Sequence, residues 1–190
     1  MKQLMAFFLL LAITAGAQAI PTHYYGEING SGNYNGAVDI NFGWVDAPFG
    51  LNSWGEHVNL WGFNASSGDL LSFDIDSDNL ATGFSLYFGE VNSMDLLLGL
   101  FNNSGDIGTA SYLAGSSLWG NEQSLSDLLI NQTGFYTLII GGKDFGGYDG
   151  YTYQLNLTQV PEPAGLLLLI SGLLGLVVLR YRANNTNNRI

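Results

Sequence analysis

The segment Tyr151-Thr152-Tyr153-Gln154-Leu155-Asn156-Leu157-Thr158 alternates apolar and polar side chains without interruption. Successive side chains of an extended chain point to opposite faces, so the tyrosines and leucines share one face and the polar residues share the other. This alternation is typical of an antiparallel strand with one face on a core and one in water. Its partner is predicted to be residues 135–140, joined to it by the turn-rich loop 141–150.

Working outward, similar short segments rich in aromatic and branched side chains alternate with turns rich in Gly, Asn, Ser and Asp. The predicted strands are residues 22–28, 38–42, 57–63, 70–75, 84–88, 96–101, 110–113, 135–140 and 151–157. Residues 124–130 are predicted to form one short helical turn, and residues 20–55 to contribute edge strands and loops. Together these elements predict an all-β fold, an antiparallel β-sandwich of jelly-roll-like type.

The two ends of the chain differ in character from this β region. Residues 1–19 combine Lys2, the apolar stretch 4–15 and the small-residue sequence Ala17-Gln18-Ala19. This order is that of a secretory signal peptide, with cleavage expected after Ala19. The predicted β-domain, residues 20–159, would therefore work outside the cytoplasm.

At the other end, Val160-Pro161-Glu162-Pro163 precedes sixteen uncharged residues, 164–179, and then Arg180-Tyr181-Arg182. The two prolines require an extended backbone at residues 160–163. A helix over 164–179 would be about 24 Å long, close to the thickness of a bilayer core. The arginines match the cytoplasmic end of such a helix, so residues 180–190 are predicted to be a basic cytoplasmic tail.

The tail, residues 160–190, resembles a PEP-CTERM sorting signal in three elements that occur in order: Pro161-Glu162-Pro163, the Leu/Gly-rich helix, and Arg180 with Arg182. The resemblance implies export by a Gram-negative bacterium. It also implies recognition by an exosortase, a membrane-embedded transpeptidase that processes such proteins near the motif. The membrane helix would then be a temporary anchor, and the mature domain would reach the cell surface or the medium.

The amino-acid composition excludes some classes of function for the predicted domain. Residues 20–159 contain fifteen acidic residues and one basic residue, Lys143, for a formal charge of −14. Nucleic-acid binding, which requires a basic surface, is excluded on this ground. The chain has no cysteine, which excludes disulfides and thiol catalysis. The acidity is compatible either with bound divalent cations or with simple solubility.

Two segments of the domain resemble bacterial pre-peptidase C-terminal-like domains. One is Asp95-Leu96-Leu97-Leu98-Gly99-Leu100-Phe101-Asn102-Asn103-Ser104-Gly105. The other is the pair Gly134-Phe135-Tyr136-Thr137-Leu138-Ile139-Ile140-Gly141 and Gly150-Tyr151-Thr152-Tyr153-Gln154-Leu155. The resemblance covers roughly residues 69–158. It implies a non-catalytic β-sandwich, of a kind that in some members binds calcium and is implicated in carbohydrate or surface binding.

Carboxylates provide the candidate metal ligands. Asp74, Asp76 and Asp78 occupy alternate positions and would share one face of an extended segment, as ligands of Ca²⁺ could. The alternative is that these aspartates only face water while Phe73 and Ile75 face the core. Asp144 and Asp149, in a glycine-rich loop, are a second candidate pair, with an ordinary hairpin loop as the alternative.

Aromatic residues raise the possibility of sugar binding, because exposed rings stack on sugar faces. Trp44 and Trp54 lie in a Gly-rich stretch and are the predicted stacking residues; the alternative is that they belong to the core. The chain lacks the nucleophile-elbow, zinc-protease and phosphate-loop motifs. Acid pairs such as Glu56 with Asp74 could serve a glycosidase, but a chain this acidic always offers some pair.

Three functions follow in order of preference. The first is a non-enzymatic exported protein of the cell envelope or extracellular matrix, sorted by an exosortase and associated with exopolysaccharide. The second is a calcium-dependent carbohydrate-binding module. The third is a secreted polysaccharide hydrolase.

Overall fold

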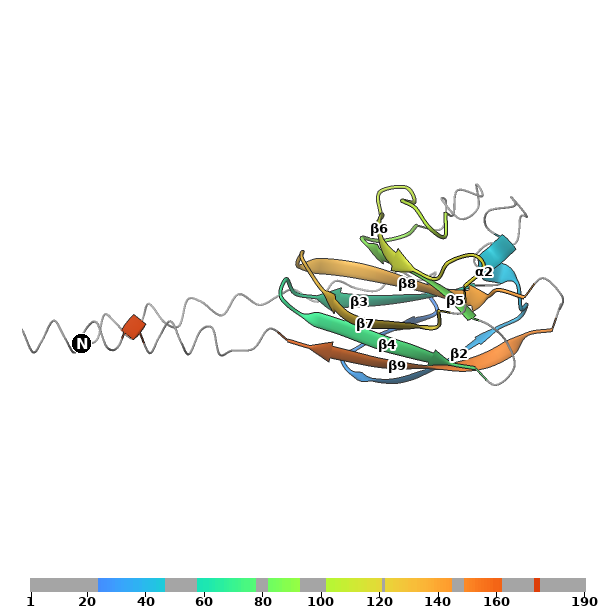
Figure 1. Cartoon of the computed structure of the whole chain (residues 1–190), viewed down its shortest axis with the longest axis horizontal. Helices are drawn as coiled ribbons and strands as arrows, with labels where there is room; N and C mark the ends of the chain where they lie inside the picture. The colour runs from blue at the N-terminus through green and yellow to red at the C-terminus, as the bar shows by residue number, and fades with distance from the viewer. Residues whose placement is uncertain are drawn as a thin grey trace, which may run out of the picture. The chain divides into compact units, whose positions relative to one another are not determined.

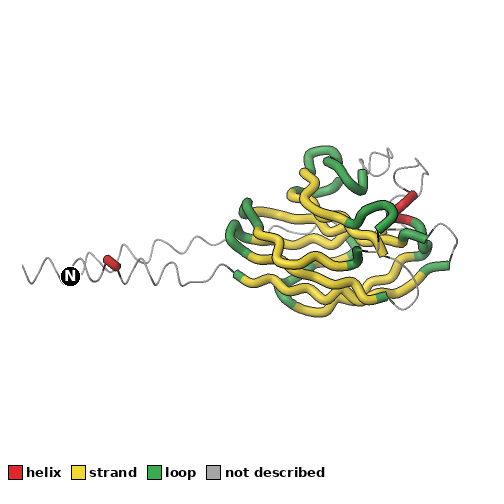
Figure 2. Tube along the Cα trace, in the orientation of Figure 1, coloured by secondary structure: helices red, strands yellow, loops and turns green. Residues whose placement is uncertain are grey.

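The computed structural model describes residues 24–46, 58–77, 82–92, 102–120, 122–144, 149–161 and 173–174. The chain divides into two units, Met1–Val160 and Pro161–Ile190, which are treated separately. The described part of the first unit is an all-β sandwich of two sheets (Figure 1). In Figure 2 strands dominate the sandwich, and its helix α2 is a single short turn.

One sheet has five strands in the order β1-β3-β8-β5-β6, and the other has four in the order β2-β9-β4-β7. All neighbouring strands are antiparallel except β1, which runs parallel to β3. The elements are β1 Gly26–Glu27, β2 Gly32–Val38, α2 Gly43–Asp46, β3 Val58–Ala65, β4 Leu70–Asp76, β5 Thr82–Phe88, β6 Ser111–Gly115, β7 Ser124–Leu129, β8 Gly134–Gly142 and β9 Tyr151–Val160.

The five-stranded sheet is buried on both faces. Its inner face packs on the four-stranded sheet through a core that includes Phe63, Phe84 and Leu138. Its outer face is covered by the segments 40–46, 89–92 and 102–110, and Trp44 and Ile107 take part in that second cluster. The central strand β8 is therefore almost continuously apolar, and Phe135–Gly142 is buried throughout.

The four-stranded sheet is buried on one face only, which explains the alternation in β9. Leu155 and Leu157 are buried in the core, whereas Thr152 and Thr158 are exposed on the opposite face. The strand is thus half-buried, as its sequence predicts. The outer face of this sheet is the large regular surface left open by the described part of the fold.

The predicted hairpin between residues 135–140 and 151–157 is wrong. Both segments are strands, but β8 pairs with β3 and β5, while β9 pairs with β2 and β4 in the other sheet. The connection after Gly142 therefore crosses from one sheet to the other. The burial patterns give the reason, because β8 is apolar on two faces and β9 on one, and such strands suit different sheets.

The predicted helical turn over residues 124–130 is also wrong, because this segment is strand β7. Leu125 and Leu128 both pack on the core although they are three residues apart. A bulge explains this spacing: Leu71 pairs with Leu128 and Phe73 with Leu125, so β7 has one extra residue. Asp127 occupies the bulge with a φ of 51°, and its N–H donates to Ser72 Oγ at 2.9 Å.

Other strand predictions fare differently. The segment predicted at 38–42 is wrong, since β2 ends at Val38 and the chain turns into α2. Residues 20–55 do contribute edge strands, because β1 and β2 each lie at an edge of a sheet. The strand predicted at 96–101 lies entirely outside the described residues.

A hydrogen-bonded tyrosine joins the two sheets. Tyr153 of β9 accepts hydrogen bonds at its Oη from Trp61 Nε1 at 2.7 Å and Asn59 Nδ2 at 3.0 Å, both on β3. Asn59 Nδ2 also donates to the carbonyl of Ala37 on β2, at 2.9 Å. By contrast, the buried hydroxyl of Tyr151, two residues earlier in the same strand, has no hydrogen-bond partner among the described residues.

This difference makes Tyr153→Phe and Tyr151→Phe a matched pair. We expect Tyr153→Phe to lower the free energy of unfolding by about 1–3 kcal/mol, because it leaves two buried donors without their acceptor. Tyr151→Phe removes a hydroxyl that satisfies no described donor, so its effect should be much smaller. Urea unfolding followed by tryptophan fluorescence measures both, and equal losses in the two variants would contradict this account.

Burial also changes the acidity of the core tyrosines. It raises the pKa of Tyr24 from 10.0 to about 12. Burial also raises the pKa of Tyr87, Tyr151 and Tyr153. Tyr24 Oη remains hydrogen-bonded, to Thr137 Oγ1 at 2.5 Å and to the N–H of Val91 at 2.9 Å.

These shifts predict unfolding by alkali. The folded state holds the tyrosine protons more tightly than the unfolded chain, so this stability is complete below pH 10 and is lost as the pH rises above 10. Burial lowers the pKa of Lys143, so this residue makes the fold more stable as the pH rises, but only up to pH 10.5. We expect tyrosinate absorbance to appear together with loss of tertiary structure. Titration of all tyrosines near pH 10 in an intact fold would contradict the prediction.

Candidate binding face

The outer face of the four-stranded sheet presents two straight rows of polar side chains. Residues that pair directly across neighbouring strands have their side chains on the same side of the sheet, and so do every second residues along one strand. The first row is Asn33, Asn156, Asp74 and Ser124. The second row is Asn35, Gln154 and Asp76. The face is therefore rich in amide groups and carries carboxylates on β4.

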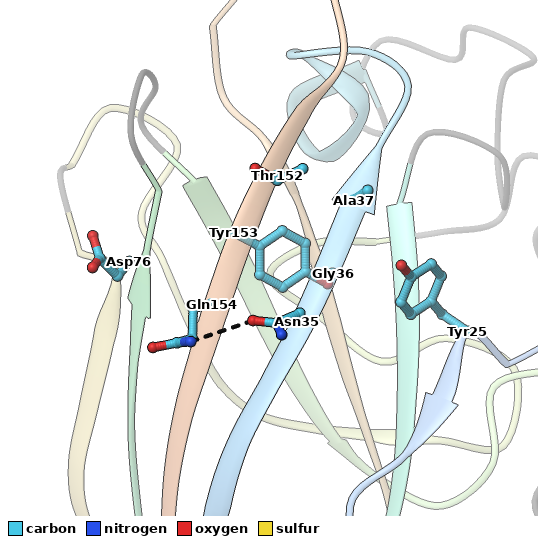
Figure 3. A pocket seen from close by; sticks show the side chains of 8 residues that line it. All are labelled: Tyr25, Asn35, Gly36, Ala37, Asp76, Thr152, Tyr153 and Gln154. Carbon is cyan, nitrogen blue, oxygen red and sulfur yellow. Dashed lines mark hydrogen bonds between the residues drawn. The ribbon is translucent and has the colours of Figure 1, made fainter.

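A hollow of about 550 Å³ lies over one part of this face, and it is open to solvent. It lies across β2 and β9 and is lined mainly by outward side chains of these strands and of β4 (Figure 3). Its lining is Tyr25, Asn35, Gly36, Ala37, Asp76, Thr152, Tyr153 and Gln154.

Gly36 is buried and makes room for the ring of Tyr153 beside β2. It pairs directly with Tyr153, and a Cβ at position 36 would lie only 2.2 Å from Cζ of the tyrosine ring. Glycine therefore lets the ring lie against β2, as Figure 3 shows.

Tyr25 provides an exposed aromatic ring at the edge of the hollow, with half of its surface open to solvent. The ring meets Trp61 edge to face, with centroids 5.1 Å apart, and the Tyr25 N–H donates to the carbonyl of Leu60 at 2.8 Å. Buried neighbours thus hold this ring in place. In Figure 3 it lies on the opposite side of β2 from Asp76.

Amides supply most of the polar chemistry of the hollow. Gln154 Nε2 donates to Asn35 Oδ1 at 3.3 Å, which orients both side chains (Figure 3). Each amide keeps further donor and acceptor capacity for a ligand. Asp76 has the one carboxylate among the described lining residues, so these residues alone do not supply the acid pair that a glycosidase uses.

The structure places part of the predicted calcium cluster. Asp74 and Asp76 are both exposed on the outer face, as the alternation predicts, whereas Asp78 lies outside the described residues. Asp149 is exposed, and the Asp144 N–H donates to the carbonyl of Asn41 at 2.9 Å. Within the described ranges no three His, Cys, Asp or Glu side chains gather as a metal site. Calcium binding stays a prediction.

The predicted stacking role of Trp44 is wrong. Its side chain is fully buried on the outer face of the five-stranded sheet, and Nε1 donates to Ser85 Oγ at 2.9 Å. The Lys143 ammonium lies 5.7 Å from the ring centroid. The segment around Trp44 folds onto the five-stranded sheet because the outer face of that sheet is apolar and is buried by it. Trp54 lies outside the described residues.

Sequence reasoning missed Tyr25, although a signal was present. Tyr24 and Tyr25 are adjacent in an extended segment, so one must point inward and the other outward. Tyr24 is buried, and Tyr25 is the outward ring. A second exposed ring is Trp119, which is 80% exposed in the connection between β6 and β7, away from the hollow.

The predicted targeting segments lie mostly outside the described residues. This applies to Ala17 and Ala19, to Glu162 and Pro163, and to Arg180 and Arg182. Val160, the first residue of the predicted motif, is extended as the last residue of β9 and pairs with Leu70. In the part of the chain that the structure describes, no helix is long and apolar enough to cross a membrane.

Neither models of known protein families nor curated proteins match the chain. Its fold is similar to that of CorA, a surface-associated copper-binding protein of Methylomicrobium album BG8, with 11% identity over 73% of this chain and 98% of that chain and a TM-score of 0.53. At this identity the similarity shows the β-sandwich fold and nothing further.

Two other solved structures align with lower scores. PliG of Aeromonas hydrophila, a periplasmic inhibitor of g-type lysozyme, has 8% identity over 70% of this chain and 93% of that chain, with a TM-score of 0.42. The pre-peptidase C-terminal domain of a Bacillus anthracis collagenase has 16% identity over 74% of this chain and 100% of that chain, with a TM-score of 0.41.

Proposed function

We propose that this chain is a non-enzymatic exported protein of the bacterial cell envelope that binds a neutral polysaccharide on the outer face of its four-stranded sheet. The observation that carries the proposal is the hollow over β2 and β9, where a fixed exposed ring stands beside oriented amides. Its signal peptide and sorting signal would deliver it to the cell surface or the matrix around the cell.

The chemistry of the hollow suits sugars. The apolar face of a pyranose stacks on an aromatic ring, and Tyr25 offers such a ring without having to reorder. Amides can donate to one hydroxyl and accept from another, so Asn35 and Gln154 can bind a vicinal pair. The open shape of the hollow admits an internal segment of a polymer as well as a chain end.

Charge selects among polysaccharides. Residues 20–159 carry a formal charge of −14, and Asp74 and Asp76 lie on the binding face itself. An anionic polymer such as a polyuronate would be repelled at short range. A neutral polymer avoids this repulsion. The calcium-dependent alternative differs here, because Ca²⁺ bound by the aspartates would bridge to an anionic sugar.

Removing the ring or an amide from the hollow should weaken binding. We expect Tyr25→Ala and Gln154→Ala each to lower the affinity for a neutral glucan by about tenfold, equivalent to about 1.4 kcal/mol. Affinity electrophoresis through gels containing the polysaccharide measures the change. Trp119→Ala is the matched control, since it removes an exposed ring that does not line the hollow.

Two results would contradict this assignment. If Trp119→Ala abolishes retention while Tyr25→Ala has no effect, the hollow is not the sugar site. If retention needs Ca²⁺ and disappears with a chelator, and if Asp74→Asn together with Asp76→Asn has the same effect, the calcium-dependent alternative replaces the neutral one. No binding to any polysaccharide would refute both.

Sorting is tested separately in a host with an exosortase. Deletion of Pro161-Glu162-Pro163 should leave the chain unprocessed in the membrane fraction, because the enzyme loses the motif that it reads. The intact chain should appear as a shorter form at the surface or in the medium. Immunoblots of fractionated cells measure both, and identical size and location would refute the sorting proposal while leaving the sugar site untouched.

A further inference from the structure

Three exposed apolar side chains form a row at one end of the four-stranded sheet. Leu70 of β4 pairs on one side with Leu129 of β7 and on the other with Val160 of β9. Their exposed fractions are 38%, 52% and 47%. The row therefore crosses three neighbouring strands, in contrast to the polar rows farther along the same face.

The row lies at the end of the sandwich where the chain leaves β9. Residues 161–163 alone separate Val160 from Ala164, where the predicted membrane helix begins. A fully extended chain spans at most about 3.6 Å per residue, so Cα of Val160 cannot lie more than about 14 Å from Cα of Ala164. An inserted helix would therefore hold this end of the sandwich close to the bilayer surface.

The turns around the row carry little charge. Those at this end of the sandwich are Gly30-Ser31, Ser66-Ser67-Gly68 and Asn131-Gln132-Thr133. Asp69 is buried, and its carboxylate accepts from the Ser66 N–H at 2.9 Å and from Gln159 Nε2 at 2.8 Å. The nearby acids are Glu27 of β1, half-buried Glu90, exposed Asp106, whose carboxylate accepts from the Tyr112 N–H, and Asp127, which is bonded to Ser72.

The opposite end of the sandwich carries another group of acids together with Lys143, the one basic residue of residues 20–159. Its strand ends and connections carry Asp39, Asp76, Glu122, Asp144 and Asp149. Both ends therefore carry acids, and the exposed apolar row is the feature that distinguishes them. Hydrophobicity indicates that the end where the chain leaves β9 is the one that meets the membrane.

We propose that the row Leu70–Leu129–Val160 rests in the interface of the lipid bilayer while the chain is anchored, and so fixes this end of the sandwich at the membrane surface. This inference rests on the membrane helix of the proposed function. The occupant is the lipid surface, to which exposed leucines and a valine at headgroup depth contribute apolar contact.

The absence of cysteine makes a direct test possible. The full chain carrying Leu129→Cys is labelled with a nitroxide and reconstituted in phosphatidylcholine vesicles. Ser124→Cys is the matched control, because it is exposed on the same strand β7 at its other end. Collisions with lipid-soluble oxygen and with a water-soluble nickel chelate report the depth of each label.

We expect the ratio of oxygen to nickel collisions to be several-fold higher at position 129 than at position 124. Equal ratios in chains that resist carbonate extraction would overturn the lipid contact but leave the membrane helix in place. Chains removed by carbonate would overturn the helix and this inference together. Short label-to-label distances between copies, with no lipid protection, would assign the row to self-association instead.

Discussion

The hydroxyl of Tyr153 is the point on which the rest of this sandwich depends. It joins β9 of one sheet to Trp61 and Asn59 of the other, deep between the sheets. Trp61 in turn meets the rings of Tyr25 and Tyr34 edge to face. The same buried contact that holds the sheets together therefore also sets the position of the ring beside the hollow.

This arrangement connects the stability of the fold with the proposed binding of a polysaccharide. A binding site of low affinity gains most from groups that are already held in place, because little conformational entropy remains to be lost on binding. Tyr25 has such support from below, and Asn35 and Gln154 orient each other on the surface. Gly36 contributes by its lack of a side chain, since the ring of Tyr153 takes the space beneath it.

Much of the fold was predictable from the sequence, and the errors have identifiable causes. The alternation in β9 and the apolar runs of β3, β5 and β8 correctly predict strands. Periodicity does not say which strands share a sheet, however, and the predicted pairing of β8 with β9 is therefore wrong. In β7 the bulge at Asp127 gives Leu125 and Leu128 a helical spacing, and only the pairing with β4 reveals the strand.

The candidate site was harder to predict, because it depends on register. Asn35, Gln154 and Asp76 are far apart in the chain and meet only when β2 and β4 both pair with β9. The prediction that Trp44 is exposed is wrong. A Gly-rich segment is typical of an exposed loop, but it can equally fold back and cover one face of a sheet. The burial of Trp44 follows from packing against a distant strand, which its local sequence does not encode.

The position of β9 has a consequence for the proposed export of the chain and for the proposed C-terminal sorting signal. Strands β2 and β4 lie on either side of β9 and meet through it, and β9 is the last strand of the sandwich. In a chain exported from its N-terminus, the four-stranded sheet cannot close until residues 151–160 have crossed the membrane. The domain would thus stay unfolded and threadable through most of its passage, and completion of the fold would coincide with arrival of the C-terminal signal.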